Sequence, residues 1–420
     1  MVERICPKCK IPMNADVCVK KSCHTKTVMS TTLYWCEECN VPTFEPVCPK
    51  CGTEGKYIST DIRPVFPEER LLLALVQGKE NPHCYENSSV WYGSGVYIID
   101  GKKEKISITE INKWPLDKIK AIKEDYDRLS DSIDSSYFDS NVAVFVEVNK
   151  ERYNYITEEA MRFVSSYRDQ YAVEDMMVSF SGGKDSTVTS HIVNSALGTN
   201  KVLHIFGDTT LEFPTTLEYK KRFNKNEESK GVRVLTAKNR EKNFEELCEV
   251  VGPPSRVMRW CCTVFKTGAI QKTIASAFKD KTNILSFQGI RHSESASRSK
   301  YERESESPKI AKQTVASPII DWIDYDVWLY ILTTGIDFNY AYRLGYTRVG
   351  CWCCPNNGAW SEFLSKVHMY EQYVHWHELL LNFAEKIGKP DAEDYVNDGK
   401  WKARQGGNGL EAAQTSVVTF

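Results

Sequence analysis

The chain has 420 residues, enough for two or three domains with buried cores. Its 54 basic and 56 acidic residues nearly cancel, and a formal net charge of −2 excludes a global basic field that would attract nucleic acid. There is no run of 18 apolar residues and the N-terminus lacks the apolar core of a signal peptide, so the sequence predicts a cytoplasmic protein without a membrane partner.

Residues 1–55 hold eight of the 15 cysteines, arranged in close pairs. In a chain without a secretion signal, such pairs indicate metal binding rather than disulfides. Two pairs are followed by two more at the same spacing, so each half could supply four thiolates to one Zn²⁺. Interleaved pairing of the halves stays open, as does His24 as a substitute ligand. The expected zinc ligands are Cys6, Cys9, Cys18, Cys23, Cys36, Cys39, Cys48 and Cys51.

Residues 56–172 are expected to form a small α+β domain that carries no recognisable chemistry. Cys84 stands alone in it and is interpreted as structural. The expected elements are a proline-started helix near Glu68, a strand–turn–strand over 90–101, and helices near 115–135 and 157–170 around an apolar run at 142–148.

Residues 173–360 alternate between strand-like and helix-like segments, which predicts an α/β domain with a mostly parallel, doubly wound sheet. Ligands of such sheets bind beyond the carboxyl ends of the strands. Residues 361–420 are expected to form a helix over 361–387 and a polar tail, whose Lys402 and Arg404 are interpreted as solvated. The expected elements of the α/β domain are strands at 175–180, 201–206, 232–236 and 283–288 and helices near 186–197, 214–228 and 264–278.

The sequence Ser-Gly-Gly-Lys-Asp-Ser joins the first of these strands to the first helix. Its glycines allow a close approach of the backbone to an anion, and the helix N-terminus and the lysine add positive charge. The serines can donate hydrogen bonds, and the aspartate can orient a donor or a metal. The loop therefore predicts a site for a phosphate chain, the alternative being a plain Gly-Gly turn. Its residues are Ser181, Gly182, Gly183, Lys184, Asp185 and Ser186.

Two carboxylates follow the second strand of the predicted sheet. Asp208 is placed to meet a ribose or an amino group of a nucleotide, and Glu212 to contact a metal or a polar substrate. The alternative for an Asp-Thr pair at this position is a helix N-cap.

Two arginines seven residues apart follow the fourth strand, on a loop that begins with glycine. The forked guanidinium groups of Arg291 and Arg298 suit a sulfate, a phosphate or a nucleic-acid backbone. The alternative is a surface loop in which Glu294 and Arg298 form an ion pair four residues apart.

A second group of cysteines consists of an adjacent pair and a later Cys-x2-Cys pair, which together could bind one inorganic centre. An iron–sulfur cluster and zinc are both compatible with these ligands, and buried inert thiols are the alternative. Cys353 is left over and is either structural or a reactive thiol that carries sulfur. The candidate ligands are Cys261, Cys262, Cys351 and Cys354.

The stretch from about Asp175 to Pro355 resembles the phosphoadenosine-phosphosulfate (PAPS) reductase family of PP-loop ATP pyrophosphatases. The resemblance covers a little under half of the chain and implies an adenine nucleotide α-hydrolase-like fold with an SGGxDS loop for ATP. The matching motifs are Ser181–Ser186, Asp208-Thr209 with Glu212 and Pro214, Arg259-Trp260-Cys261-Cys262, Gly289-x-Arg291 with Glu294, Ser295 and Arg298, and Gly350-Cys351-x2-Cys354.

Two branches of the family are most similar. In adenylylsulfate reductases a tandem Cys-Cys and a later Cys-x2-Cys hold a [4Fe–4S] cluster, which implies that role for the second cysteine group. The Dnd-type DNA phosphorothioation sulfurtransferase (C component) has similar Arg-Trp-Cys and Gly-Cys-Trp-x-Cys segments, which implies sulfur placement in a DNA backbone. Reductases also attack with a cysteine near the C-terminus, whereas the last cysteine here is Cys354. Either Cys353 substitutes for it or the reaction differs.

These features predict an ATP-dependent sulfur-transfer enzyme with Lys184, Asp185, Asp208 and Cys353 as catalytic residues. The expected cofactors are Mg²⁺-ATP, a [4Fe–4S] cluster and two Zn²⁺. The expected partners are an adenine nucleotide, a sulfur donor or thioredoxin-like reductant, and in one version nucleic acid. One rival is a sulfonucleotide reductase that produces sulfite. Another is a zinc-ribbon module that binds nucleic acid and uses the nucleotide site as a sensor.

Overall fold

The fold is taken from a computed structural model of the chain. It describes residues 3–6, 12–13, 15, 17–20, 22–23, 27–226, 229–295, 297–307 and 312–402. Within these ranges no helix is long and apolar enough to cross a membrane.

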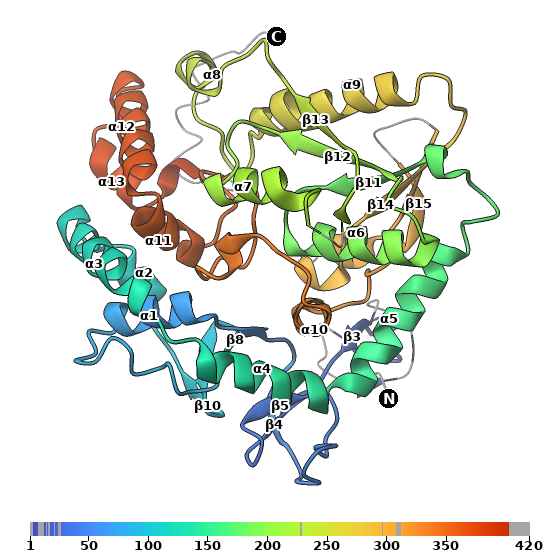
Figure 1. The fold of residues 1–420 in the computed structure, drawn as a ribbon. Coiled ribbons are helices and arrows are strands. Elements are labelled where there is room, and N and C mark those ends of the chain that lie inside the picture. Colours follow the sequence, from blue (N-terminus) through green and yellow to red (C-terminus); the bar gives the residue numbers. More distant parts are fainter. Residues whose placement is uncertain are drawn as a thin grey trace.

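A six-stranded sheet lies at the centre of the molecule, in the order β13-β12-β11-β14-β16-β15 (Figure 1). The first five strands are parallel, and β15 pairs with β16 in the antiparallel direction at one edge. This confirms the predicted α/β class with a mostly parallel sheet. The strands span Met176–Phe180 (β11), Leu203–Asp208 (β12), Val234–Lys238 (β13), Ile284–Gln288 (β14), Glu304–Glu306 (β15) and Gln313–Ala316 (β16).

Helices cover both faces of this sheet because its central strand is apolar on both sides. Alternate side chains of β11 point to opposite faces, and Met177 packs in the apolar cluster beneath one covering helix, α9. Val178 packs on the other face with Val188 of α6, on the side that also carries α7 (Figure 1). These helices span Lys184–Leu197 (α6), Pro214–Phe223 (α7) and Gly268–Ala277 (α9), and α9 continues from a π-helical turn, η4, at Cys262–Thr267.

The helices of the accessory and C-terminal regions differ from the expected ones in several places. The apolar run at 142–148 lies within a helix. The buried residues of this helix recur at helical spacing, so they face the core along one side. The predicted C-terminal helix is broken at Met369 into two. The structure also contains helices that the sequence did not indicate, namely α2, α8, α10 and α13. The remaining helices are α1 (Pro67–Val76), α2 (Ile108–Ile111), α3 (Leu116–Leu129), α4 (Ser136–Val148), α5 (Lys150–Ser165), α8 (Phe244–Val251), α10 (Asp324–Thr334), α11 (Ala359–His368), α12 (Tyr370–Lys386) and α13 (Ala392–Asn397).

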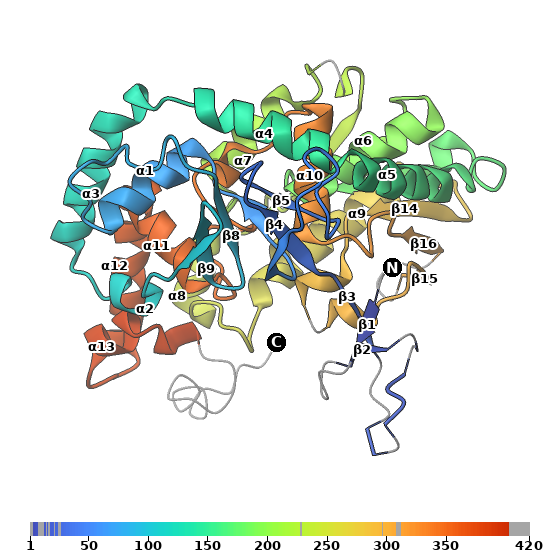
Figure 2. The same cartoon turned by 90° about the horizontal axis from the view of Figure 1, so that it is seen from below.

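Three small antiparallel sheets precede the central one in the chain. They lie below it in Figure 1, and Figure 2 shows the molecule from that side. The sheet of the accessory region includes the predicted strand–turn–strand as β8 and β9. The other two sheets belong to the cysteine-rich segment. Their strands are β1 (Glu3–Ile5), β2 (Pro12–Met13), β3 (Val28–Ser30), β4 (Leu33–Cys36), β5 (Val41–Thr43), β6 (Lys56–Ser59), β7 (Arg63–Pro64), β8 (Val90–Gly93), β9 (Val96–Ile99) and β10 (Lys102–Glu104).

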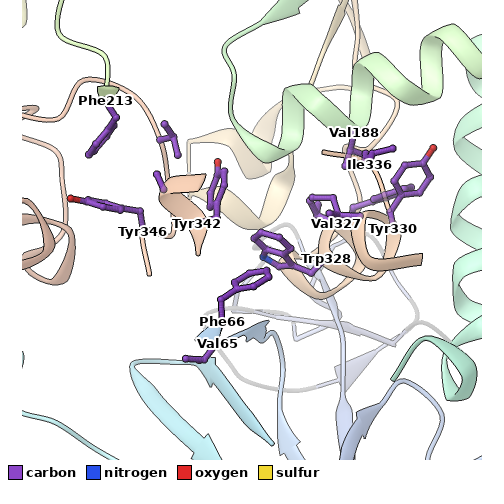
Figure 3. Packing of buried hydrophobic residues seen from close by; sticks show 14 of the residues in the cluster. Val65, Phe66, Val188, Phe213, Val327, Trp328, Tyr330, Ile336, Tyr342 and Tyr346 are labelled. Carbon is purple, nitrogen blue, oxygen red and sulfur yellow. The ribbon is translucent and has the colours of Figure 1, made fainter. Parts of the chain in front are cut away.

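One apolar core joins the accessory region to the central α/β unit (Figure 3). Phe66, which precedes α1, lies with its ring centroid 5.2 Å from that of Trp328 in α10. Trp328 also contacts the ring of Tyr342, at 5.6 Å between centroids. Tyr342 in turn contacts the predicted phosphate loop, so the packing of the accessory region reaches the candidate site.

Candidate functional site

The predicted phosphate loop lies between β11 and α6, at the carboxyl edge of the central sheet. Gly182 has a φ of +70°, a conformation that a side chain would strain. The Ser186 hydroxyl accepts a hydrogen bond from the Ser181 amide at 3.2 Å and donates one to the Gly183 carbonyl at 2.8 Å. These bonds hold the loop at the positive end of α6, which is a favourable position for an anion.

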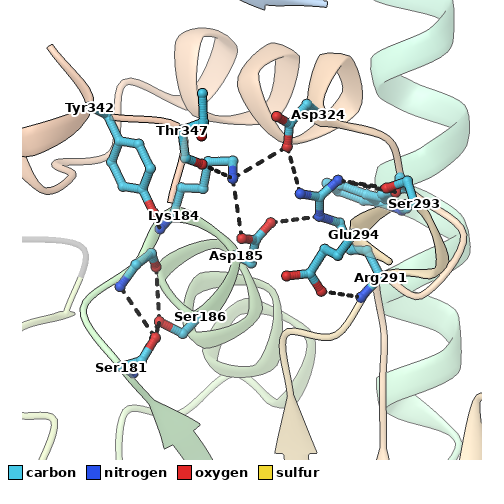
Figure 4. Close-up of polar contacts among 12 residues, drawn as sticks. Ser181, Lys184, Asp185, Ser186, Arg291, Ser293, Glu294, Asp324, Tyr342 and Thr347 are labelled. Atoms are coloured by element: carbon cyan, nitrogen blue, oxygen red, sulfur yellow. Dashed lines mark hydrogen bonds and ion pairs between the residues drawn. The ribbon is translucent and has the colours of Figure 1, made fainter. Parts of the chain in front are cut away.

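Beneath this loop two cations and two carboxylates form a buried network (Figure 4). Lys184 Nζ lies 3.3 Å from Asp185 Oδ2 and 3.3 Å from Asp324 Oδ1. Arg291 Nε lies 2.6 Å from Asp185 Oδ1, and its Nη2 lies 2.5 Å from Asp324 Oδ1. Lys184 and Arg291 are each only 3% exposed, so the carboxylates rather than water balance their charges.

The pKa values of the four groups in this network favour their charged forms. Burial alone would raise the pKa of Asp324, but Lys184 and Arg291 lower it to about 2. The pKa of Asp185 is also lowered, because Arg291 and Lys184 outweigh the effect of burial. Burial would lower the pKa of Lys184, yet the two carboxylates raise it above its ordinary value. All four groups are therefore ionised at neutral pH.

Both cations bind carboxylates of the chain itself. Lys184 and Arg291 were predicted to face an anionic ligand, and that role stays a prediction. Their interactions fix Asp185, the second residue of α6, against the loop that follows β14. This leaves the backbone N–H groups and the serine hydroxyls of the loop as its candidate anion ligands.

The backbone of the two loops approaches closely at Gly289. A Cβ atom on this residue would stand 2.6 Å from the carbonyl oxygen of Asp185 and 2.9 Å from the amide nitrogen of Ser186. Real Cβ atoms do not come so near to backbone, so only glycine fits. The glycine that opens the predicted arginine loop is therefore explained by its contact with α6.

A segment that sequence reasoning did not single out covers the phosphate loop. We call residues 339–347 the clamp segment. The Asn339 side-chain amide donates to the Gly182 carbonyl at 3.2 Å, and the Tyr342 hydroxyl accepts from the Lys184 amide at 2.9 Å. Lys184 Nζ donates to the Thr347 carbonyl at 3.3 Å. Three contacts thus join the clamp segment to consecutive parts of the loop.

Asp208 and Glu212 lie at the carboxyl end of β12, on the neighbouring strand. Asp208 accepts a hydrogen bond from the Thr210 amide at 2.9 Å and forms an ion pair with Lys238 at 3.2 Å. Glu212 accepts from the amide and the hydroxyl of Thr209, at 3.0 and 2.7 Å. Burial raises the pKa of Glu212. Both carboxylates hold the turn that follows β12, and this strand end adjoins the phosphate loop. Neither caps α7, which begins after Phe213 without a side-chain cap.

Arg298 lies apart from the buried network, at the surface. Its guanidinium forms an ion pair with Glu294, four residues earlier, and its side chain is 31% exposed. Glu294 also accepts a hydrogen bond from the Arg291 amide at 3.0 Å. The structure thus contains the ion pair that was the alternative interpretation of this loop.

The second cysteine group is attached to the same edge of the sheet. Cys351 forms a β-bridge with Glu212, and the Trp352 amide donates to the Leu211 carbonyl at 2.9 Å. The Thr209 hydroxyl lies 3.3 Å from Cys351 Sγ. These contacts connect the later cysteine pair directly to the turn that follows β12.

The earlier cysteine pair lies close to the later one. A hydrogen bond with Cys262, burial and the charges of Cys351 and Cys354 together raise the pKa of Cys261. The four sulfur atoms, all in described residues, nevertheless include no three that lie within 4.8 Å of one another. A single zinc ion with bonds of about 2.3 Å needs a tighter group, whereas a cluster binds each thiolate through a different metal atom. Which of the two centres these cysteines bind stays a prediction.

Cys353, the remaining cysteine of this motif, is buried among apolar side chains. It is 8% exposed and packs in an apolar cluster with Cys248, Phe265 and Trp376. Burial raises the pKa of this thiol well above its usual range. A thiol in such surroundings is a poor nucleophile, which is unfavourable for the sulfur-carrying role that the sequence suggested.

The N-terminal cysteines form two groups that can hold metal. Cys36 Sγ lies 3.4 Å from Cys51 Sγ, and Cys39 Sγ lies 3.7 Å from Cys48 Sγ. Four thiolates around one Zn²⁺ at 2.3 Å would stand about 3.8 Å apart, so these residues fit the ion. In the other half Cys6, Cys18 and Cys23 converge. Consecutive pairs, not interleaved ones, thus share a site, while Cys9, His24 and Arg404 lie outside the described residues.

Comparison with known proteins gives the family of the central unit. A model of the phosphoadenosine phosphosulfate reductase domain matches residues 175–357. These residues belong to that family. An adenosine 5'-phosphosulfate reductase of Neisseria meningitidis serogroup B is 34% identical over 98 residues, 23% of this chain and 36% of that protein.

Other relatives match the chain beyond the residues of the family model. An uncharacterized protein of Methanocaldococcus jannaschii is 31% identical over 277 residues, which are 66% of this chain and 54% of that protein. The chain thus spans about half the length of this curated relative. A crystal structure of phosphoadenylyl-sulfate reductase from Candida auris is 14% identical, with a TM-score of 0.37, and covers 49% of this chain and 97% of that one.

The PAPS reductase domain also contains site residues that no motif indicated. Asp324 lies 139 positions after Asp185 in the chain, and a lone aspartate before a helix is ordinarily read as a cap. Tyr342 and Thr347 belong to a segment without any recognisable pattern. Only knowledge of which strands and loops are neighbours in space could have brought these residues to the phosphate loop.

Proposed function

We propose that the chain is an ATP-dependent sulfur-transfer enzyme, which cleaves ATP to AMP and pyrophosphate in order to activate an acceptor. The observation that carries this proposal is the β-bridge between Glu212 and Cys351. It joins the strand end beside the phosphate loop to a group of four cysteines, so that activation and sulfur chemistry would share one edge of the sheet. Membership of the PAPS reductase family supports a sulfur-related reaction.

In this proposal the loop Ser181–Ser186 binds the β and γ phosphates through backbone N–H groups and serine hydroxyls. Mg²⁺ enters with the ATP phosphates. The buried pairs of Lys184 and Arg291 with Asp185 keep the start of α6 in place, so that its positive end stabilises the charge that develops on the leaving group. Asp208 at the next strand end is the candidate contact for the ribose or adenine.

The reaction would proceed in two displacements. An acceptor oxygen attacks the α-phosphorus, the bond to the bridging oxygen of the β-phosphate breaks, and pyrophosphate leaves. A sulfur nucleophile from a donor then takes the place of that oxygen, which departs with AMP. A cluster held by Cys261, Cys262, Cys351 and Cys354 would supply electrons or a binding site for sulfur. A nucleic-acid phosphate is one candidate acceptor in this scheme.

Turnover of ATP tests the proposal directly. Protein loaded with iron, sulfide and zinc is incubated with Mg²⁺-ATP, with and without nucleic acid, and AMP and pyrophosphate are quantified. We expect both products in equal amounts, and we expect them to disappear in Lys184→Met but not in Lys201→Met, which changes an exposed lysine beyond α6. If the loaded wild-type protein yields neither product under any condition, the proposal is wrong.

The composition of the second cysteine group has its own test. An anaerobic absorption spectrum with iron, sulfide and zinc analysis is recorded for the wild type, Cys351→Ser and Cys84→Ser. We expect Cys351→Ser to lose iron and sulfide while Cys84→Ser, a change at an exposed cysteine, keeps them. Loss of a zinc ion instead would assign this group to zinc.

Sulfonucleotide reduction is the second candidate, because one relative is an adenosine 5'-phosphosulfate reductase. It predicts sulfite release from adenosine 5'-phosphosulfate in the presence of a dithiol reductant. The buried position of Cys353 counts against this candidate, because a thiol enclosed by apolar side chains is a poor nucleophile. Sulfite release that is lost in Cys353→Ser would favour reduction over ATP cleavage.

A further inference from the structure

Tyr342 is the side chain through which the clamp segment touches the start of α6. Its hydroxyl accepts a hydrogen bond from the Lys184 amide at 2.9 Å, and a Cβ atom on Gly183 would stand 3.1 Å from the same oxygen. The hydroxyl therefore lies against the bend of the phosphate loop, where the first amide of the helix points outward (Figure 4).

The hydrogen-bonding capacity of this hydroxyl is only half used. A phenol can donate one hydrogen bond as well as accept, and the structure gives the Tyr342 proton no acceptor among the residues that it describes. The side chain is only 2% exposed, so bulk water does not readily replace the missing acceptor. A buried hydrogen-bond donor without an acceptor costs free energy, and a ligand that supplies the acceptor removes this cost.

The surroundings keep this proton on the phenol, because burial raises the pKa of Tyr342 to about 12. The amide of Lys184 donates into the phenol oxygen at the positive end of α6, and accepting such a bond polarises the O–H bond. Lys184 Nζ lies 5.4 Å from the ring centroid. An anion is the natural acceptor for a proton held in this way.

We infer that Tyr342 is a phosphate-binding residue, whose hydroxyl donates to a phosphate oxygen of the nucleotide held on Ser181–Ser186. This inference rests on the proposed function, because it presupposes a polyphosphate on that loop. It adds to the loop a donor from a distant part of the chain, one that carries no charge and therefore does not compete with Mg²⁺ neutralisation of the phosphates.

The test compares two phenylalanine variants by isothermal titration with inorganic pyrophosphate and with adenosine. Tyr342→Phe removes only the hydroxyl. The matched control is Tyr346→Phe, a tyrosine of the same segment that is 1% exposed and whose hydroxyl lies 3.3 Å from that of Ser365. We expect Tyr342→Phe to weaken pyrophosphate binding about tenfold or more and to leave adenosine binding unchanged. Tyr346→Phe should change neither by more than about twofold.

The outcomes separate this inference from the proposed function. If the wild type binds neither ATP nor pyrophosphate, both are wrong. If the wild type binds pyrophosphate and Tyr342→Phe binds it equally well, only the inference fails. Equal weakening for pyrophosphate and adenosine would also overturn it, because that result would indicate a structural role.

A spectroscopic measurement covers the case in which Tyr342→Phe does not fold. A phenol that begins to donate to an anion shifts its ultraviolet absorption to longer wavelength. We expect this difference signal when pyrophosphate is added to the wild type and to Tyr346→Phe. The absence of any tyrosine signal in a wild-type protein that binds pyrophosphate would overturn the inference.

Discussion

At the scale of single residues, the candidate site depends on a few short distances between parts of the chain that are far apart in sequence. One of them is at Gly289, where a Cβ atom would stand 2.6 Å from the Asp185 carbonyl oxygen. It lets Arg291, two residues later, reach the Asp185 carboxylate. A residue without a side chain is thus as important to the loop as the charged groups around it.

Replacing this glycine should separate the loops. In Gly289→Ala the added carbon would overlap the Asp185 carbonyl at 2.6 Å, so the start of α6 must move. We expect pyrophosphate affinity, measured by isothermal titration, to fall about tenfold or more. Gly358→Ala is the control, because its added carbon meets nothing within 4 Å. Unchanged affinity in Gly289→Ala would show that the close approach is not needed for binding.

The stability of the protein should carry a pH dependence from Asp61. Its carboxylate accepts the amides of Asp324 and Tyr325, and burial together with the charge of Asp324 raises its pKa to about 7 from 3.8. The folded state then keeps a proton that the unfolded state releases. The resulting stabilisation is complete below about pH 4 and is lost as the pH rises through about 7.

A variant that cannot titrate isolates this effect. Between pH 4.5 and 8 the unfolding free energy of the wild type should fall by about 3 kcal/mol relative to that of Asp61→Asn. Urea unfolding at the two pH values measures both proteins, and effects of pH on the metal sites cancel in the comparison. A difference that is absent or has the opposite sign would mean that Asp61 is ionised in the fold.

Site residues that are contiguous in sequence could be predicted, whereas residues that reach the site from distant parts of the chain could not. The loop Ser181–Ser186 was predicted because its glycines, serines and helix start are contiguous. The partner of its lysine, Asp324, reaches the loop only through the order of the strands. For the same reason the sequence did not reveal that Lys184 and Arg291 pair with carboxylates of the chain itself.

At the scale of elements, the strands that carry continuous apolar runs were predicted close to their observed positions. β11 to β14 agree with the expected segments within a few residues. β15 was missed because Glu304–Glu306 is polar, short and at the edge of the sheet, and β16 was missed because Gln313–Ala316 is short and begins with two polar residues. The apolar run in α4 was ambiguous because β-branched residues also fill helices that pack on a core.

The zinc group of Cys36, Cys39, Cys48 and Cys51 allows a prediction at this scale. Its strands β4 to β6 are short, and Cys36 and Cys48 are buried in the same apolar cluster as Trp35, so the ion should help to hold that cluster together. We expect Cys39→Ser to bind one zinc fewer per chain by mass spectrometry or atomic absorption, and Cys84→Ser to bind as much as the wild type. Pyrophosphate binding should persist in Cys39→Ser. Its loss would favour the ribbon-based binding module instead.

At the scale of the whole molecule, the accessory region holds the clamp segment in place. Arg343 of the clamp lies 2.6 Å from Glu68 in α1. Next to it Glu69, which is fully buried, pairs with Arg63 at 2.7 Å, and Arg63 donates to the Gly345 carbonyl at 3.3 Å. Burial makes these ion pairs costly to break one partner at a time. The region without recognisable chemistry thus positions the cover of the phosphate loop.

Weakening the ion pair between Arg343 and Glu68 should lower anion binding at the phosphate loop. In Glu68→Gln the charge that faces Arg343 is lost, so the clamp should be held less firmly. We expect pyrophosphate affinity to fall about threefold to tenfold by isothermal titration. Glu147→Gln serves as the control, since it removes an exposed pair with Lys50 between α4 and the ribbon. If both variants lose pyrophosphate affinity equally, or if neither loses any, the accessory region does not hold the clamp segment against the phosphate loop.

The apolar core that continues from Phe66 to Trp328 limits how the chain can be shortened. An expression fragment that starts at residue 173 would keep every motif of the nucleotide site, yet it would uncover the flank of α10 to solvent. Exposed aromatic surface of that kind drives aggregation. Crystallisation or enzymology on a trimmed version would therefore report on a damaged protein, and the segments before the sheet have to accompany it.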